Sequence, residues 1–202
     1  MMVVALSCIP HDLEISCFGT LSKYIKEGHE VCLIIAKSKE TWSKETINAI
    51  MKSSRIIGVS KIYFVSELNS SLVTQDNVKK LRSHIETLDP TIVIFPSIRT
   101  GDGIRKIFAK SCLLACRGIG NIMMYDSQKN ANFRPTIFSI INGELEVKKS
   151  CLDTYGKKVG TNKTSKKNMM LLLKRYRIEA GIKNFVEAFE TNRILLLSNA
   201  GF

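Results

Sequence analysis

The sequence has no apolar run long enough to cross a bilayer, and several chemically useful residue types are scarce in it. Its 202 residues include one tryptophan, four prolines and three histidines. Because no apolar run is long enough for a membrane-spanning helix, we expect no membrane partner. The apolar segment 1–9 is short and no basic residue precedes it, which favours a buried first strand over an export signal.

Cysteine pairs at the spacing of a zinc ribbon or of a secreted disulfide framework are also absent. The six cysteines are Cys8, Cys17, Cys32, Cys112, Cys116 and Cys151. With no export signal before them, we predict that they are reduced, mostly buried thiols in a cytoplasmic protein.

No stretch is rich enough in proline or glycine to link two domains, and no internal repeat is present. The chain is 45% hydrophobic and 24% charged, as is usual for a globular protein of this size. We therefore predict one domain that spans residues 1–202.

Positive charge is in large excess, with a formal net charge of +12. Such a chain attracts anions such as nucleic acid or a phosphorylated ligand, although a basic surface can also serve solubility alone. Residues 156–168 carry five lysines and no acid, and their Gly, Thr, Asn and Ser content predicts a mobile basic loop. No aromatic residue lies among these lysines, so we do not expect a nucleic-acid partner.

Short β-branched runs alternate with longer helical stretches, which predicts an α/β fold: a Rossmann-like parallel sheet with helices on both faces. The predicted strands are 2–7, 30–36, 61–64, 91–95, 121–125, 136–141 and 193–197. The predicted helices are 17–27, 44–57, 74–88, 102–116, 144–155 and 166–180. The first four strands are almost wholly apolar, as expected for strands covered on both faces.

Ligands of such sheets lie at the carboxyl ends of the strands, so the loop after the first strand is the first candidate site. It contains Cys8, His11, Asp12 and Glu14, all able to bind metal or to move protons. The loop after strand 91–95 adds Arg99, Asp102 and Arg105.

The loop after the first predicted strand also resembles a motif of a known family. Residues 9–21, Ile-Pro-His-Asp-Leu-Glu-Ile-Ser-Cys-Phe-Gly-Thr-Leu, resemble the motif His-Pro-Asp-Asp-x-Glu-x-Gly-Cys-x-Gly-Thr-Leu of the PIG-L/LmbE-like sugar deacetylases. Further colinear similarities follow at 23–31, 114–122, 133–138 and 187–190. The resemblance implies zinc-assisted hydrolysis of an N-acetyl group on an amino sugar, with a zinc-binding His and Asp in the motif and a later zinc-binding His.

Carried over residue by residue, the family's zinc site is incomplete in this chain. Ile9 stands at the position of the first zinc-binding His, and His11 at that of the general-base Asp, while Asp12 keeps the second zinc ligand. Residues 98–105, where the later His is expected, contain no histidine. Because a catalytic zinc needs three protein ligands, we predict no zinc and no other cofactor.

The remaining candidate residues keep two interpretations each. His11 and Asp12 form either a surviving catalytic pair or remnants of a lost site, and with Cys8 they could hold a softer metal. Arg99, Asp102 and Arg105 either bind a phosphorylated or nucleotide-linked sugar, since guanidinium groups bind phosphate well, or form a solvated loop. Trp42 either stacks on a sugar ring or closes the core.

Two functions from different classes follow. The first is a divergent deacetylase homologue without zinc or N-acetyl hydrolysis, which binds an amino sugar or nucleotide sugar as an accessory protein in a carbohydrate pathway, beside an active deacetylase relative. The second is an active enzyme on such a sugar, with deacetylase-like or altered chemistry that uses His11 and Asp12. Whether the chain is an enzyme therefore stays open, and a homo-oligomer is compatible with either function.

Overall fold

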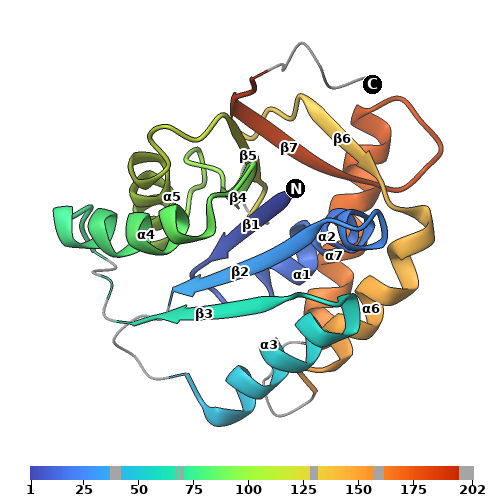
Figure 1. Ribbon diagram of the computed structural model, residues 1–202. Helices are drawn as coiled ribbons and strands as arrows, with labels where there is room; N and C mark the ends of the chain where they lie inside the picture. The colour runs from blue at the N-terminus through green and yellow to red at the C-terminus, as the bar shows by residue number, and fades with distance from the viewer. Residues whose placement is uncertain (37–41, 67, 69–70, 128–131, 157–161, 196–202) are drawn as a thin grey trace.

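A single sheet runs through the molecule in the computed structural model, which describes residues 1–36, 42–66, 68, 71–127, 132–156 and 162–195 (Figure 1). Within these residues the sheet has seven strands in the order β3-β2-β1-β4-β5-β7-β6. Strands β1 to β5 pair in parallel, whereas β7 is antiparallel to both β5 and β6. The strands are β1 (Met2–Ser7), β2 (Glu30–Ala36), β3 (Lys61–Val65), β4 (Ile92–Pro96), β5 (Asn121–Tyr125), β6 (Ile137–Ile140) and β7 (Val186–Arg193).

Helices cover both faces of the sheet, which confirms the predicted α/β fold (Figure 1). They are α1 (Asp12–Ser16), α2 (Phe18–Lys26), α3 (Lys44–Ile57), α4 (Gln75–Leu88), α5 (Gly103–Ala115), α6 (Leu145–Asp153) and α7 (Asn162–Glu179), with a 3₁₀ turn at Asn142–Glu144. Alternate residues of β1 point to opposite sides, so that Val4 packs with α4 and α5 while Val3 packs with α2 and α3. In the described part of the chain, no helix has the length and apolar character that a membrane span requires.

The order of the strands reverses beside β1. The chain runs from β1 outward through β2 to β3, then returns to the other side of β1 with β4 and continues to β5. In open sheets of this kind the crevice for a ligand opens at the carboxyl ends of the two strands that flank this reversal. These are β1 and β4, so the loops that carry His11, Asp12, Arg99 and Asp102 meet there.

The carboxyl-terminal third of the chain differs from the sequence-based prediction. The last strand is β7, Val186–Arg193, whereas the sequence predicts a strand at 193–197, of which 196 and 197 lie outside the described residues. The missed strand contains Glu187 and Glu190, whose carboxylates are both buried. Hydrogen bonds from other side chains and from backbone N–H groups make this burial possible. Acidic residues inside a buried strand hide its apolar pattern.

The predicted basic loop at 156–168 is also partly wrong, because α7 begins at Asn162. Ser165, Met169, Leu173 and Tyr176 are buried at helical spacing, and this buried stripe holds the beginning of the helix against the protein. Lys166 and Lys167 are therefore helical, while Lys157 and Lys158 lie outside the described residues.

A buried ion pair connects β7, α6 and the beginning of α2. Oε1 of Glu187 accepts from the backbone N–H of Gly19 at 2.9 Å, and Oε2 accepts from the backbone N–H of Thr20 at 2.6 Å. These are two of the donors that a helix leaves unpaired in its first turn, so Glu187 caps α2. The buried Lys148 ammonium of α6 donates to the same carboxylate and neutralises it.

Replacing Lys148 by Met should destabilise the protein by about 3–5 kcal/mol, because the charge of Glu187 would remain buried without its partner. Its neighbour Lys149 pairs with the exposed Glu146, so Lys149→Met should change stability by less than about 0.5 kcal/mol. Urea denaturation followed by circular dichroism measures both. Equal effects of the two substitutions would contradict the assigned role of Lys148.

Candidate functional site

The loop after β1 makes a tight left-handed turn at His11. The backbone of His11 has φ 59° and ψ 1°, and Asp89 is the one other non-glycine residue with positive φ in the described part of the chain. A left-handed conformation costs about 1–2 kcal/mol for most residues, although His, Asn and Asp adopt it more readily. The hydroxyl of Tyr155 accepts from the backbone N–H of His11 at 3.2 Å and helps to hold the turn.

The turn directs Asp12, the first residue of α1, into the protein, where its side chain is 0% exposed. Arg105 of α5 donates from Nε to Oδ2 of Asp12 at 2.7 Å and from Nη2 to Oδ1 at 2.8 Å. Both carboxylate oxygens are thus bound by one guanidinium fork, whose side chain is 14% exposed.

Asp102 holds the guanidinium from the other side. Its Oδ1 accepts from the backbone N–H of Arg105 at 2.9 Å, which makes Asp102 the N-cap of α5, and its Oδ2 accepts from Nη1 of Arg105 at 3.0 Å. Burial raises the pKa of Asp12, and the hydrogen bonds from Arg105 oppose that rise. Burial alone would lower the pKa of Arg105, but Asp12 and, to a smaller extent, Asp102 raise it, so the guanidinium stays charged.

The imidazole of His11 lies beside this ion pair without a hydrogen-bond partner for Nδ1 in the described structure. Burial, followed by the positive charge of Arg105, lowers the pKa of His11 to about 4. The ring is therefore neutral at physiological pH. It packs edge-to-face on Tyr155 with 5.3 Å between the ring centroids.

Glu14 belongs to a separate buried network behind the turn. Its Oε1 accepts from the hydroxyl groups of Ser53 and Tyr155, each at 2.6 Å, and burial raises its pKa. The Tyr155 hydroxyl thus accepts from the backbone of His11 and donates to Glu14. The sequence does not single out Tyr155 or Ser53, because they lie far along the chain from the turn that they hold.

A small pocket, partly open to solvent, adjoins the His11 ring. Its walls are mainly apolar, with His11, Glu14, Ser7 and Tyr155 as the polar groups; the apolar residues are Ile9, Pro10, Leu13, Phe18, Leu33, Ile35 and Ile50. Ile9 contributes an apolar wall where the family resemblance implies a metal ligand.

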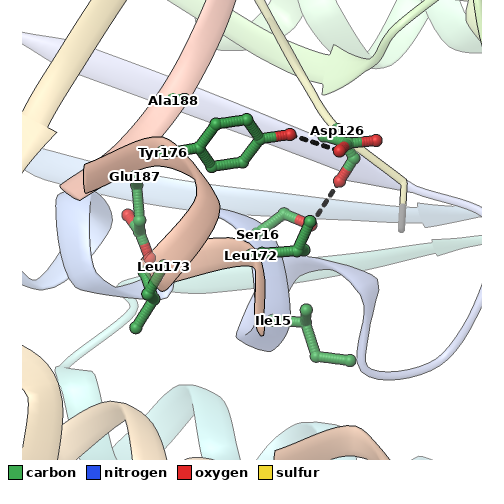
Figure 2. A pocket seen from close by; sticks show the side chains of 8 residues that line it. All are labelled: Ile15, Ser16, Asp126, Leu172, Leu173, Tyr176, Glu187 and Ala188. Carbon is green, nitrogen blue, oxygen red and sulfur yellow. Dashed lines mark hydrogen bonds between the residues drawn. The ribbon is translucent and has the colours of Figure 1, made fainter. Parts of the chain in front are cut away.

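A second small pocket lies between α1, α7 and the segment after β5 (Figure 2). Asp126 accepts from the hydroxyl of Tyr176 through its carboxylate, and from Oγ of Ser16 at 2.7 Å through its backbone oxygen. Leu172 and Leu173 supply apolar walls (Figure 2). Asp126 thus binds both Ser16 and Tyr176 and connects α1 and α7 to the segment after β5.

The other predicted site residues, Arg99 and Trp42, contact other parts of the protein. Arg99 has a side chain that is 55% exposed, and its Nε lies 3.7 Å from Oε1 of the buried Glu190. Oε2 of Glu190 accepts from the hydroxyl of Ser97 at 2.7 Å. Trp42 is half-buried and packs against the core on the α3 side of the sheet.

The described residues around Asp12 do not form the three-ligand arrangement of a catalytic zinc. Among the described residues, no group of three His, Cys, Asp or Glu side chains is placed to hold a metal ion. Both oxygens of Asp12 accept from Arg105, and burial raises the pKa of the Cys8 thiol well above its ordinary value. A catalytic zinc needs three protein ligands and a position for water, which this arrangement does not supply.

Solved structures place this fold among known ones. A conserved protein from Thermus thermophilus matches with a TM-score of 0.84 at 14% identity over 99% of this chain and 98% of that one. The 4-carboxy-2-hydroxymuconate hydratase GalB from Pseudomonas putida matches with a TM-score of 0.82 at 12% identity, over 99% of both chains. The N,N'-diacetylchitobiose deacetylase from Pyrococcus horikoshii has a TM-score of 0.77 at 15% identity, over 94% of this chain and 83% of that one.

Deacetylases and a hydratase share this fold. No protein-family model matches the sequence, and no curated protein is similar to it at the sequence level. Identities of this size show the fold alone, and one fold can carry several activities. The reaction must therefore be argued from the residues of the site.

The pKa of His11 makes the stability of the protein depend on pH. In the unfolded chain His11 binds a proton below about pH 6.5, but in the folded protein only below about 4. The unfolded state binds more protons between these values, so stability should fall as the pH falls from about 6.5 to 4, by about 1–3 kcal/mol. His11→Asn, which suits the left-handed turn, should remove this part of the loss in urea denaturation at the two pH values. The same pH dependence in both proteins would contradict the buried neutral imidazole.

Proposed function

We propose that this chain is a divergent sugar deacetylase homologue that has no catalytic zinc and does not hydrolyse N-acetyl groups. It binds an amino sugar or nucleotide sugar as an accessory protein of a carbohydrate pathway in the cytoplasm. The observation that carries this proposal is the Asp12 carboxylate, both of whose oxygens accept from Arg105. The carboxylate that would bind zinc is already neutralised by a side chain, and Ile9 adds no ligand.

The surroundings of the crevice support binding of a negatively charged sugar. Arg99 is exposed on the loop after β4, at the edge of the sheet where ligands of such folds lie. The net charge of +12 favours anions over the whole molecule. A phosphorylated or nucleotide-linked amino sugar combines an anionic group with a ring, and the accessory protein would present it to an active deacetylase relative or act within a homo-oligomer.

One observation favours a second function, an enzyme with altered chemistry. His11 is held in a left-handed turn with a neutral imidazole and no partner for Nδ1 in the described structure. Strained residues with such unpaired groups often lie at active sites. A neutral imidazole can accept a proton from water or from a sugar hydroxyl, although a pKa of about 4 makes it a weak base.

Protein purified without chelators should contain fewer than about one zinc per ten chains, because the three ligands of a catalytic site are not assembled. It should release no acetate from N-acetylglucosamine or from its phosphorylated and nucleotide-linked forms. A lone general base accelerates a reaction by about 10²–10⁴-fold and does not replace metal-bound water. Elemental analysis and an acetate assay measure the two results.

Acetate release would contradict the proposal if His11→Ala or Asp12→Ala abolished it, and the second function would then hold. Stoichiometric, tightly held zinc would also contradict the proposal, since it would require ligands other than those found here.

Binding of the sugar should depend on Arg99. We expect Arg99→Ala to weaken binding of a nucleotide-linked N-acetylamino sugar about 10-fold in calorimetry, because one hydrogen bond to a charged group is lost. Arg55 lies exposed on α3, away from the loop after β4, so Arg55→Ala removes the same charge as a control and should leave binding unchanged. Equal losses in both variants would indicate nonspecific attraction by net charge.

A further inference from the structure

The negative charge of the buried Asp12 carboxylate is compensated by one cationic side chain, Arg105. Its two oxygens are hydrogen-bonded to Arg105, while the nearby charges of Asp102 and Asp126 disfavour its ionised form. His11, its chain neighbour, is neutral and contributes no charge. Arg105 is therefore the group that compensates the charge of Asp12.

The position of Arg105 in its helix indicates that Asp12 determines its placement. Arg105 is the third residue of α5, near the positive end of the helix dipole, where a cation is unfavourable by about 0.3–1 kcal/mol. Asp102 compensates for this as the N-cap and also holds Nη1. Three of the five N–H groups of the guanidinium donate to carboxylate oxygens of Asp12 and Asp102, so the fork is held in one orientation.

These contacts place a fixed positive charge beside Asp12, the residue to which the family resemblance assigns the role of a zinc ligand. A guanidinium neutralises the carboxylate through two parallel hydrogen bonds and offers no position at which water could be activated. A metal ion needs additional ligands, which Ile9 and the apolar wall beside it do not provide. The chain thus keeps a carboxylate paired with a positive charge, but this charge cannot activate water as a metal ion would.

We infer that Asp12 and Asp102 form a cation site whose cation is supplied by the chain itself, and that removing the Arg105 side chain opens it to a small external cation of the guanidinium type. The inference rests on the proposed absence of zinc in the natural protein. It is tested separately, because it concerns the response of a variant to an added cation and not the zinc content of the natural chain.

The test is the thermal unfolding of Arg105→Ala with and without guanidinium chloride at low, non-denaturing millimolar concentration, against sodium chloride at equal ionic strength. Without guanidinium the midpoint should lie roughly 6–20 °C below that of the natural protein, because one partner of a buried ion pair is lost. Guanidinium should raise the midpoint of the variant by a few degrees, as any ligand that binds only the folded state does. It should not raise that of the natural protein, where Arg105 fills the site.

Two variants control the result. Lys106→Ala removes the same charge from the same helix at an exposed position, and should not respond to guanidinium. Asp12→Asn combined with Arg105→Ala removes the carboxylate that binds the cation, and should not respond either. A response in either control, or none in Arg105→Ala, would overturn the inference.

If Arg105→Ala cannot be purified, Arg105→Gln replaces it, and its stability is compared with that of Asp12→Asn/Arg105→Gln. The double variant should unfold at the higher temperature, because it buries no uncompensated charge. A double variant that is less stable than Arg105→Gln would show that Asp12 is not an uncompensated anion, and would equally overturn the inference.

The unfolding of Arg105→Ala is also measured with added zinc, which distinguishes the type of cation. Stabilisation by zinc and not by guanidinium would show a metal site in place of the guanidinium site.

Discussion

The ion pair between Asp12 and Arg105 is the contact on which the candidate site depends. It joins the loop after β1 to α5, which begins beyond the loop after β4, at the place where the order of the strands reverses. Because Asp12 is fully buried, the two loops cannot separate without exposing a charge pair or leaving a carboxylate unpaired. The left-handed turn at His11 directs the Asp12 carboxylate toward α5. Asp102 caps α5 and holds the Arg105 guanidinium in the orientation that this contact requires.

Much of the fold could be predicted from the sequence, because β1, β2 and β4 are apolar runs and the helices between them have clear caps. In the structure Thr74 and Asp102 accept from the backbone N–H three residues on and so cap α4 and α5. Strand β7 could not be predicted, since Glu187 and Glu190 become compatible with burial only through partners elsewhere in the chain.

The composition of the site could be predicted more fully than its connections. Because ligands of such sheets lie at the carboxyl edge, the sequence alone indicates that His11, Asp12, Asp102 and Arg105 lie near one another. From the sequence, Arg105 either binds a phosphorylated or nucleotide-linked sugar or belongs to a solvated loop, but in the structure its guanidinium binds Asp12, which lies 93 residues away in the chain. Side-chain pairing over such a distance leaves no local pattern in a sequence.

The cap that Glu187 places on α2 has a consequence for synthesis of the protein. The backbone N–H group of Gly19 is synthesised long before its partner Glu187, which lies 168 residues later, in the last strand of the described structure. Pairings between distant residues form slowly, and a nascent chain leaves the surfaces they cover exposed until the partner arrives. Helix α2, beside the candidate site, therefore stays uncapped until Glu187 has been synthesised.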